Sequence, residues 1–195
     1  MKKRTVILIT CLALISISII WTIKEYNNLI VAEESVTTAW SNVESQYQRR
    51  ADLIPNLVNT VKGYTTHEKE TPESVVSARA KAIQTNISND LSAENIQKFQ
   101  VAQNEVGSAL GRLLAISENY PDLKANQNFI NLQEQLEGTE NRIQVERQKF
   151  NETVKSYNIR IRRFPTNIVA QWFNFETKST FTANQNTENA PIIEF

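Results

Sequence analysis

Residues 6–23, VILITCLALISISIIWTI, form a run of eighteen residues without a charged side chain. As a helix rising about 1.5 Å per residue, this run is roughly 27 Å long, close to the roughly 30 Å hydrocarbon core of a bilayer. It begins at Val6 and ends at Ile23, and Trp21 near its downstream end suits a membrane–water interface. The run predicts a transmembrane anchor followed by one polar domain.

Two other readings of this run are less favoured. A cleaved signal peptide needs a small-x-small site after its apolar region. Ser16 and Ser18 have that spacing but lie inside the run, which ends in IIWTI. Lipidation would use Cys11, but only a short apolar stretch precedes it, and Thr10 is bulky for the position before a lipidated cysteine. The sequence therefore favours an anchor that stays attached.

The charges that flank the anchor indicate its orientation. Residues 1–5 form a basic flank with Lys2, Lys3 and Arg4, whereas only Lys24 follows the run closely. Basic residues are retained on the cytoplasmic side of a membrane. We therefore expect a single-pass protein of the bacterial cell membrane, whose domain lies outside the cytoplasm.

The composition argues against several function classes. The chain has 21 basic and 21 acidic residues, whereas a nucleic-acid-binding surface needs a basic excess. It has one cysteine, inside the apolar run, and one histidine. His67-Glu68 therefore cannot form an HExxH zinc motif, which needs a second histidine. We predict no catalytic residues, no metal site and no cofactor, and so no enzyme.

After the anchor, apolar residues recur every three, four or seven positions. Such narrow stripes are typical of helices that pack at about 20° in an antiparallel bundle. The pattern predicts an all-α protein: a single N-terminal transmembrane helix followed by an elongated antiparallel four-helix bundle over residues 26–175, with seams like those of a coiled coil. The first predicted helix continues directly from the anchor and carries its apolar stripe from Leu29 to Tyr47. The second starts near Asp52 and runs to Ile83, the third is capped by Ser92 and has its stripe from Phe99 to Ser117, and the fourth extends from about 126 to 163. The polar residues 176–195 are predicted to form a disordered tail.

The predicted junction between the first two helices contains the densest charged cluster. Asp52 suits an N-cap, and Pro55 would fall in the first turn, where its missing N–H costs nothing. Arg49 and Arg50 could form a fork for a carboxylate or phosphate group. The favoured interpretation is structural, with Asp52 as the cap and one arginine paired across the bundle end. Farther along, Thr71-Pro72 is compatible with a kink or with a new helix start.

Two aromatic residues are candidates for lining a groove between helices. Trp40 and Tyr64 both lie at stripe positions. Aromatic side chains at such positions are more often core than ligand contacts, so the core interpretation is favoured.

Several motifs resemble the LemA family. They are WSNV at 40–43, YQRRADLIPNLV at 47–58, VKGY at 61–64 and ENYPDLKAN at 118–126. The resemblance extends from Tyr26 to Phe175. It implies a bacterial, membrane-anchored, antiparallel helical bundle without established enzymatic activity and without transferable catalytic residues. Asn174 stands where the family often has glycine, and asparagine tolerates a left-handed backbone better than most residues.

These observations predict a non-enzymatic interaction or scaffold protein of the bacterial envelope. Its expected partners are the lipid bilayer, through the N-terminal helix, and a protein that the sequence does not identify. Narrow seams on long helices also suit packing between copies, so self-association stays open. The alternative is a module that binds lipid or a small molecule in an inter-helix groove lined by Trp40, Tyr64 or Phe99.

Overall fold

The computed structural model describes residues 3–65, 68–85, 87 and 90–182. Within these ranges it contains helices and no β-strand. The helices are α1 (Lys3–Lys62), α2 (Glu70–Gln84), α3 (Ala93–Ser117), α4 (Pro121–Lys124), α5 (Gln127–Arg162) and α6 (Thr166–Trp172). The predicted all-α class is confirmed.

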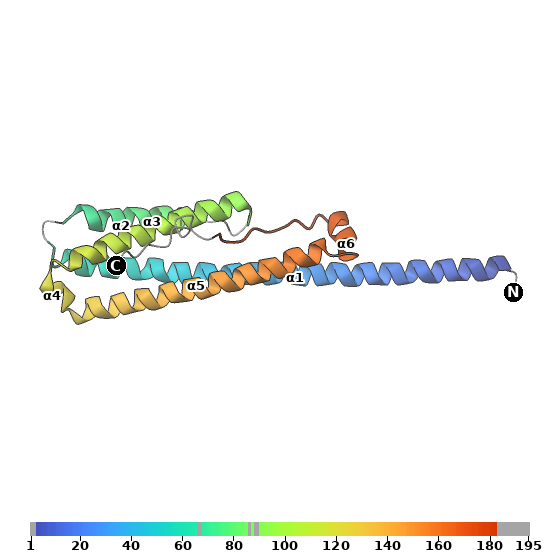
Figure 1. Ribbon diagram of the computed structural model, residues 1–195, viewed down its shortest axis with the longest axis horizontal. Helices are drawn as coiled ribbons and strands as arrows, with labels where there is room; N and C mark the ends of the chain where they lie inside the picture. Colours follow the sequence, from blue (N-terminus) through green and yellow to red (C-terminus); the bar gives the residue numbers. More distant parts are fainter. Residues whose placement is uncertain (1–2, 66–67, 86, 88–89, 183–195) are drawn as a thin grey trace, which may run out of the picture.

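The long helices run antiparallel to their neighbours in sequence (Figure 1). Helices α1 and α5 pack along each other, while α2 and α3 form a hairpin beside the far half of that pair. The bundle therefore has four helices only in the half farther from the N-terminus. In the nearer half, other parts of the chain must cover α1 and α5.

Helix α1 has 60 residues, about 90 Å at the usual rise. Its first part, residues 3–20, projects from the bundle with every side chain exposed. Burial begins at Trp21, close to the point where the apolar run ends. Among the described helices, α1 alone is long and apolar enough to span a membrane, and none of its apolar window is buried. Length and composition thus make it a candidate membrane span.

The predicted break between the first two helices is wrong, because α1 continues through Asp52 and Pro55 to Lys62. Pro55 has no N–H, so the carbonyl oxygen of Ala51 lacks its usual helical partner. That oxygen instead accepts a hydrogen bond from Arg79 Nε in α2, at 2.7 Å. A side chain from another helix thus satisfies the carbonyl and lets α1 pass the proline unbroken.

The other helix boundaries agree better with the sequence. Helix α2 starts at Glu70, so Pro72 lies in the first turn of a new helix and not at a kink. At the start of α5, Asn126 Oδ1 accepts hydrogen bonds from the backbone N–H groups of Asn128 (2.9 Å) and Phe129 (3.1 Å). This side chain is an N-cap that fixes where the helix begins.

Two apolar clusters fill the bundle. We call them the proximal core and the distal core, according to their distance from residues 3–20, the exposed first part of α1, which we call the bare segment. The main buried residues of the proximal core are Leu29, Val36, Trp40, Val43, Phe99, Ile143, Phe150, Val154, Tyr157 and Phe181. Those of the distal core are Ile54, Leu57, Val61, Val75, Val106, Leu113, Leu123, Phe129 and Leu136. Helices α1, α3 and α5 contribute to both.

Residues 176–182, which we call the strap, differ from the predicted disordered tail. Asn158 donates to the Lys178 carbonyl (2.8 Å) and accepts from the Lys178 N–H (3.0 Å). Asn151 makes the same pair of bonds to the backbone of Phe181, at 3.1 and 2.9 Å. Phe181 is buried and stacks on Trp40, with ring centroids 5.8 Å apart. The strap thus closes the half of the bundle that α2 and α3 leave open. The rest of the predicted tail, 183–195, lies outside the described residues.

The chain turns sharply between α6 and the strap. Asn174 has φ 57°, in the left-handed region, as its tolerance for that conformation predicted. The turn is closed by a 2.9 Å hydrogen bond from the Phe175 N–H to the Ala170 carbonyl. Just before this turn, the ring of Phe173 packs on Tyr26 of α1, with ring centroids 4.6 Å apart.

Candidate interaction site

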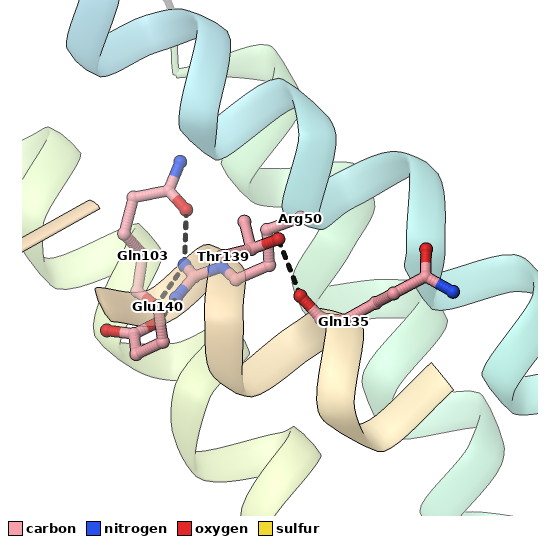
Figure 2. A network of polar contacts seen from close by, with 5 residues as sticks. All are labelled: Arg50, Gln103, Gln135, Thr139 and Glu140. Carbon is pink, nitrogen blue, oxygen red and sulfur yellow. Dashed lines mark hydrogen bonds and ion pairs between the residues drawn. The ribbon is translucent and has the colours of Figure 1, made fainter. Parts of the chain in front are cut away.

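A polar layer separates the proximal core from the distal core. It consists of Arg50 on α1, Gln103 on α3 and Thr139 on α5, all buried (Figure 2). Each stands where its helix's three-and-four spacing calls for an apolar residue. The apolar stripes of three helices are thus interrupted at one level.

The guanidinium of Arg50 connects the three helices. Nη2 donates to Gln103 twice, at 2.7 Å to the side-chain oxygen Oε1 and at 3.1 Å to the backbone carbonyl. Nη1 donates to Glu140 Oε2 at 2.9 Å. Thr139 directs its hydroxyl to the Gln135 carbonyl of its own helix, at 2.7 Å. The layer therefore gives its buried side chains hydrogen-bond partners.

The ion pair between Arg50 and Glu140 is only partly removed from water. Its side chain is 6% exposed, but that of Glu140 is 47% exposed. A pair of this kind contributes modestly to stability, because desolvation of the cation offsets much of the Coulombic gain. Its clearer effect is on register, since sliding one helix by a turn would bury the charge among apolar residues.

A groove of about 850 Å³ opens beside this layer, between α1 and the α2–α3 hairpin. Tyr47, Phe99 and Val106 contribute apolar surface to it. Charged side chains also line it, and they are Glu44, Arg49, Arg50, Asp52 and Arg79. Its volume falls in the usual range for ligand pockets, roughly 300–1,000 Å³, but its shape is open. With both positive and negative side chains and a strip of apolar surface, the groove is suited to bind a segment of another molecule that carries complementary groups.

Tyr47 lies where the groove meets the proximal core. Its ring packs edge-on against Phe99, with centroids 5.0 Å apart, and Arg50 lies over its face at 5.1 Å. Burial raises the pKa of the Tyr47 phenol, although the nearby Arg147 and Arg50 cations act in the opposite direction. The hydroxyl is therefore a neutral hydrogen-bonding group at physiological pH.

The predicted junction residues lie close together but not as expected. Arg50 is buried in the polar layer, whereas Arg49 is exposed on the groove's rim, so the two do not form a fork. Asp52 does not cap a helix, because it lies within α1, and its Oδ1 accepts from Gln48 at 2.8 Å. Pro55 is half-buried inside α1. The expected pairing of one arginine is found, but in the middle of the bundle and not at its end.

The two candidate groove aromatics lie apart. Trp40 is buried in the proximal core, edge-on to Phe99 and Phe150. Tyr64 is 40% exposed at the far end, where its hydroxyl accepts from Asn126 Nδ2 at 2.8 Å. Neither lines the groove, although Phe99 does.

The roles of Gln103, Arg79 and Glu140 were not predicted from the sequence. A signal for the layer was present, because Arg50 lies three residues after Tyr47 and four before Ile54, and Gln103 lies between Phe99 and Val106. No comparable signal existed for Arg79, whose role depends on a proline 24 positions earlier. His67 lies outside the described residues.

Comparison with known proteins gives a consistent result. The model of the LemA family matches residues 39–195. Magnetosome protein MamQ 2 of Paramagnetospirillum magneticum is 26% identical over 190 residues, an alignment that covers 88% of this chain and 69% of that protein. Protein LemA of Metamycoplasma hominis is 26% identical over 159 residues, covering 82% of this chain and 69% of that protein.

Proposed function

The chain belongs to the LemA family, and on this premise we propose that it is a single-pass bacterial membrane protein whose helical domain acts as a non-enzymatic interaction module. In this proposal α1 anchors the domain, the domain lies outside the cytoplasm, and the groove beside the polar layer contacts a protein partner. Magnetosome protein MamQ 2, to which the chain is similar, is named for the magnetosome.

The observation that carries the proposal is the division of α1 into a bare and a packed part. Residues 3–20 are exposed, and from Val6 onward they are uncharged and mostly apolar, which is unfavourable in water. The same helix continues without a break into the bundle core, down to Val61. A membrane would bury the bare part and leave the domain rigidly attached, as a tethered interaction module requires.

The groove supplies a surface for recognition. Its lining combines the exposed Arg49 with carboxylates such as Asp52. Such mixed charge favours recognition of a complementary polar segment over uptake of a purely apolar ligand. The side chains that form the groove are held by interhelical bonds, because Arg79 and Arg50 are both fixed to neighbouring helices. A partner would therefore meet a preorganised surface.

The first experiment tests the anchor and the orientation. The full chain, expressed in a bacterium, should stay with the membrane pellet after alkaline carbonate extraction. Protease added to spheroplasts should digest the domain. Extraction into the soluble fraction would overturn the anchor, and complete protection from protease would reverse the orientation.

The second experiment tests the groove. A photo-reactive amino acid at Arg49, on the rim, should give a discrete adduct in native membranes. A matched control at Val145, 51% exposed on α5 and outside the groove, should not. Equal labelling at both positions, or labelling at Val145 alone, would contradict a partner site at the groove.

The groove's volume also supports a second candidate, the binding of a lipid or small molecule. This candidate predicts a bound ligand in native mass spectrometry of the purified full chain. Ser45→Trp would place a bulky ring in the groove from an exposed lining position and should remove that ligand. Arg49 adducts in the parent chain, without any bound ligand there, would favour the protein partner.

A further inference from the structure

An exposed aromatic surface surrounds α6 at the end of the bundle from which the bare segment projects. We call it the foot and define it as Phe164, Ile168, Trp172 and Phe173. Their side chains are 75%, 38%, 69% and 49% exposed, respectively. Exposed apolar side chains that are grouped in this way commonly mark a surface that binds a membrane or another protein.

The foot is held at a defined position on α1. Val169 and Ala170 are buried against the proximal core, and Phe173 and Phe175 pack on Tyr26, with ring centroids 4.6 and 5.9 Å away. Arg160, one turn before the foot, forms an ion pair with Glu25 at 3.7 Å. Helix α6 therefore lies beside the part of α1 that immediately follows the apolar run (Figure 1).

This position corresponds to the depth of a membrane interface. If residues 6–23 span the hydrocarbon core, Tyr26 lies about 4.5 Å beyond it, among the lipid headgroups. Trp21, near the end of the same run, already packs against the bundle. No length of helix separates the span from the domain, so α6 must lie at the headgroup level as well.

The charges around the foot suit the same environment. Arg162 and Arg163 end α5 beside Phe164, both exposed, and Lys24 lies at the corresponding level of α1. Tryptophan and phenylalanine bordered by arginine and lysine are the side chains that bind at interfaces, with the rings among the acyl-chain ends and the cations on lipid phosphates.

We propose that the foot is a second membrane contact, in which Phe164, Ile168, Trp172 and Phe173 insert into the outer leaflet that α1 crosses and Arg162 and Arg163 bind anionic lipid headgroups. This inference rests on the proposed membrane anchoring. The contact fixes the tilt of the bundle, because the domain is then attached to the bilayer at two points. The contact also removes the exposed apolar surface of α6 from water and places it against lipid.

The test uses bimane fluorescence of the full chain in liposomes of phosphatidylcholine and phosphatidylglycerol that carry brominated acyl chains. Gln171→Cys, in a Cys11→Ser background, places the label on the exposed side of α6 and keeps the aromatic residues. Val145→Cys in the same background is the matched control. The native Cys11 of the unmodified chain, inside the apolar run, reports insertion of the anchor.

We expect quenching by brominated lipid at positions 11 and 171 and none at 145. Adding Phe164→Ser and Trp172→Ser should reduce quenching at 171 and leave it unchanged at 11. Arg162→Gln with Arg163→Gln should make quenching at 171 insensitive to the phosphatidylglycerol content.

Quenching at 11 without quenching at 171 would overturn the foot and leave the anchor standing. Absence of quenching at 11 would overturn the anchor and the foot together. A label at 171 that is shielded from aqueous iodide but not quenched by brominated lipid would show that a second copy or another protein covers the surface, which also overturns the lipid contact.

Discussion

Arg79 donates a hydrogen bond from Nε to the carbonyl oxygen of Ala51 at 2.7 Å, across 28 residues of sequence. The oxygen is the one that Pro55 deprives of its helical partner. This bond explains how one helix can carry both the candidate membrane span and the distal core, and it links the hairpin of α2 and α3 to that helix.

Arg79→Ala should lower the free energy of unfolding by about 1–3 kcal/mol, because a partly buried carbonyl loses its donor. In a Pro55→Ala background the helix regains its own N–H, so the same substitution should cost clearly less. Denaturant unfolding of the four variants of this cycle measures the difference. Equal costs in both backgrounds would show that Arg79 acts independently of the proline.

The polar layer predicts different effects for two replacements of Arg50. Arg50→Ala should destabilise the fold by about 2–4 kcal/mol, because it leaves a void and removes the donor to Gln103. Arg50→Met removes the same donor but should cost less, since an apolar side chain of similar length fills the seam and avoids the void. Thermal unfolding of both variants checks this. A methionine variant as unstable as the alanine variant would mean that the ionic contact, and not packing, dominates.

The strap predicts a large effect for a residue that the sequence assigned to a disordered tail. Phe181→Ala should cost about 3–5 kcal/mol, because the ring fills a site between Trp40, Phe99 and Phe150. Thr177→Ala, exposed in the same strap, is the control and should change stability by less than about 0.5 kcal/mol. Equal melting temperatures for the two variants would remove the strap from the core.

Tyr157 predicts a loss of stability at high pH. Its hydroxyl donates to the Glu176 carbonyl at 3.0 Å. Burial, together with the nearby Glu33 and Glu176 carboxylates, raises the pKa of this phenol to about 12 from its ordinary value of 10.0. Between these values the unfolded chain releases a proton that the folded chain retains, so unfolding becomes more favourable as the pH rises through this window.

The measurement is a set of unfolding curves across that pH window, together with the tyrosinate absorbance of the folded chain. In the unfolding curves, Tyr157→Phe should remove the part of the pH dependence that this residue causes. In the absorbance titration, it should remove one phenol that titrates late. Tyr47, whose pKa burial also raises, should still titrate late in that variant. An unchanged pH dependence would show that Tyr157 is accessible to solvent.

The sequence predicted the architecture well because the seams are regular. The three-and-four spacing located the core residues of α1, α3 and α5, and the predicted helix from 126 to 163 agrees with α5 (Gln127–Arg162). Asn174 was predicted to tolerate a left-handed backbone, and it has one. These features depend on local periodicity and on conformational preference, which a single sequence contains.

The features that the sequence did not predict depend on contacts between distant segments. Asp52 and Pro55 form a good local helix start, but the seam of α1 continues across them, and Arg79 satisfies the carbonyl that the proline frees. The strap has a polar composition, and only the short α2–α3 hairpin creates the space that Phe181 fills. The polar layer was not predicted because Arg50 was assigned to a junction between two helices, and the position of Gln103 between Phe99 and Val106 was not used.

The unbroken course of α1 fixes a rotational phase between the candidate membrane span and the domain. Each residue of a helix turns the chain by about 100° and advances it by about 1.5 Å. Inserting one alanine between Ser18 and Ile19, in the bare part, would leave every bundle contact intact and turn the part of the span upstream of the insertion to a different azimuth. A neighbouring protein that bound the upstream part of the span in a bilayer would then orient the bundle in a different direction. The unbroken helix therefore couples the rotation of the span to the orientation of the domain.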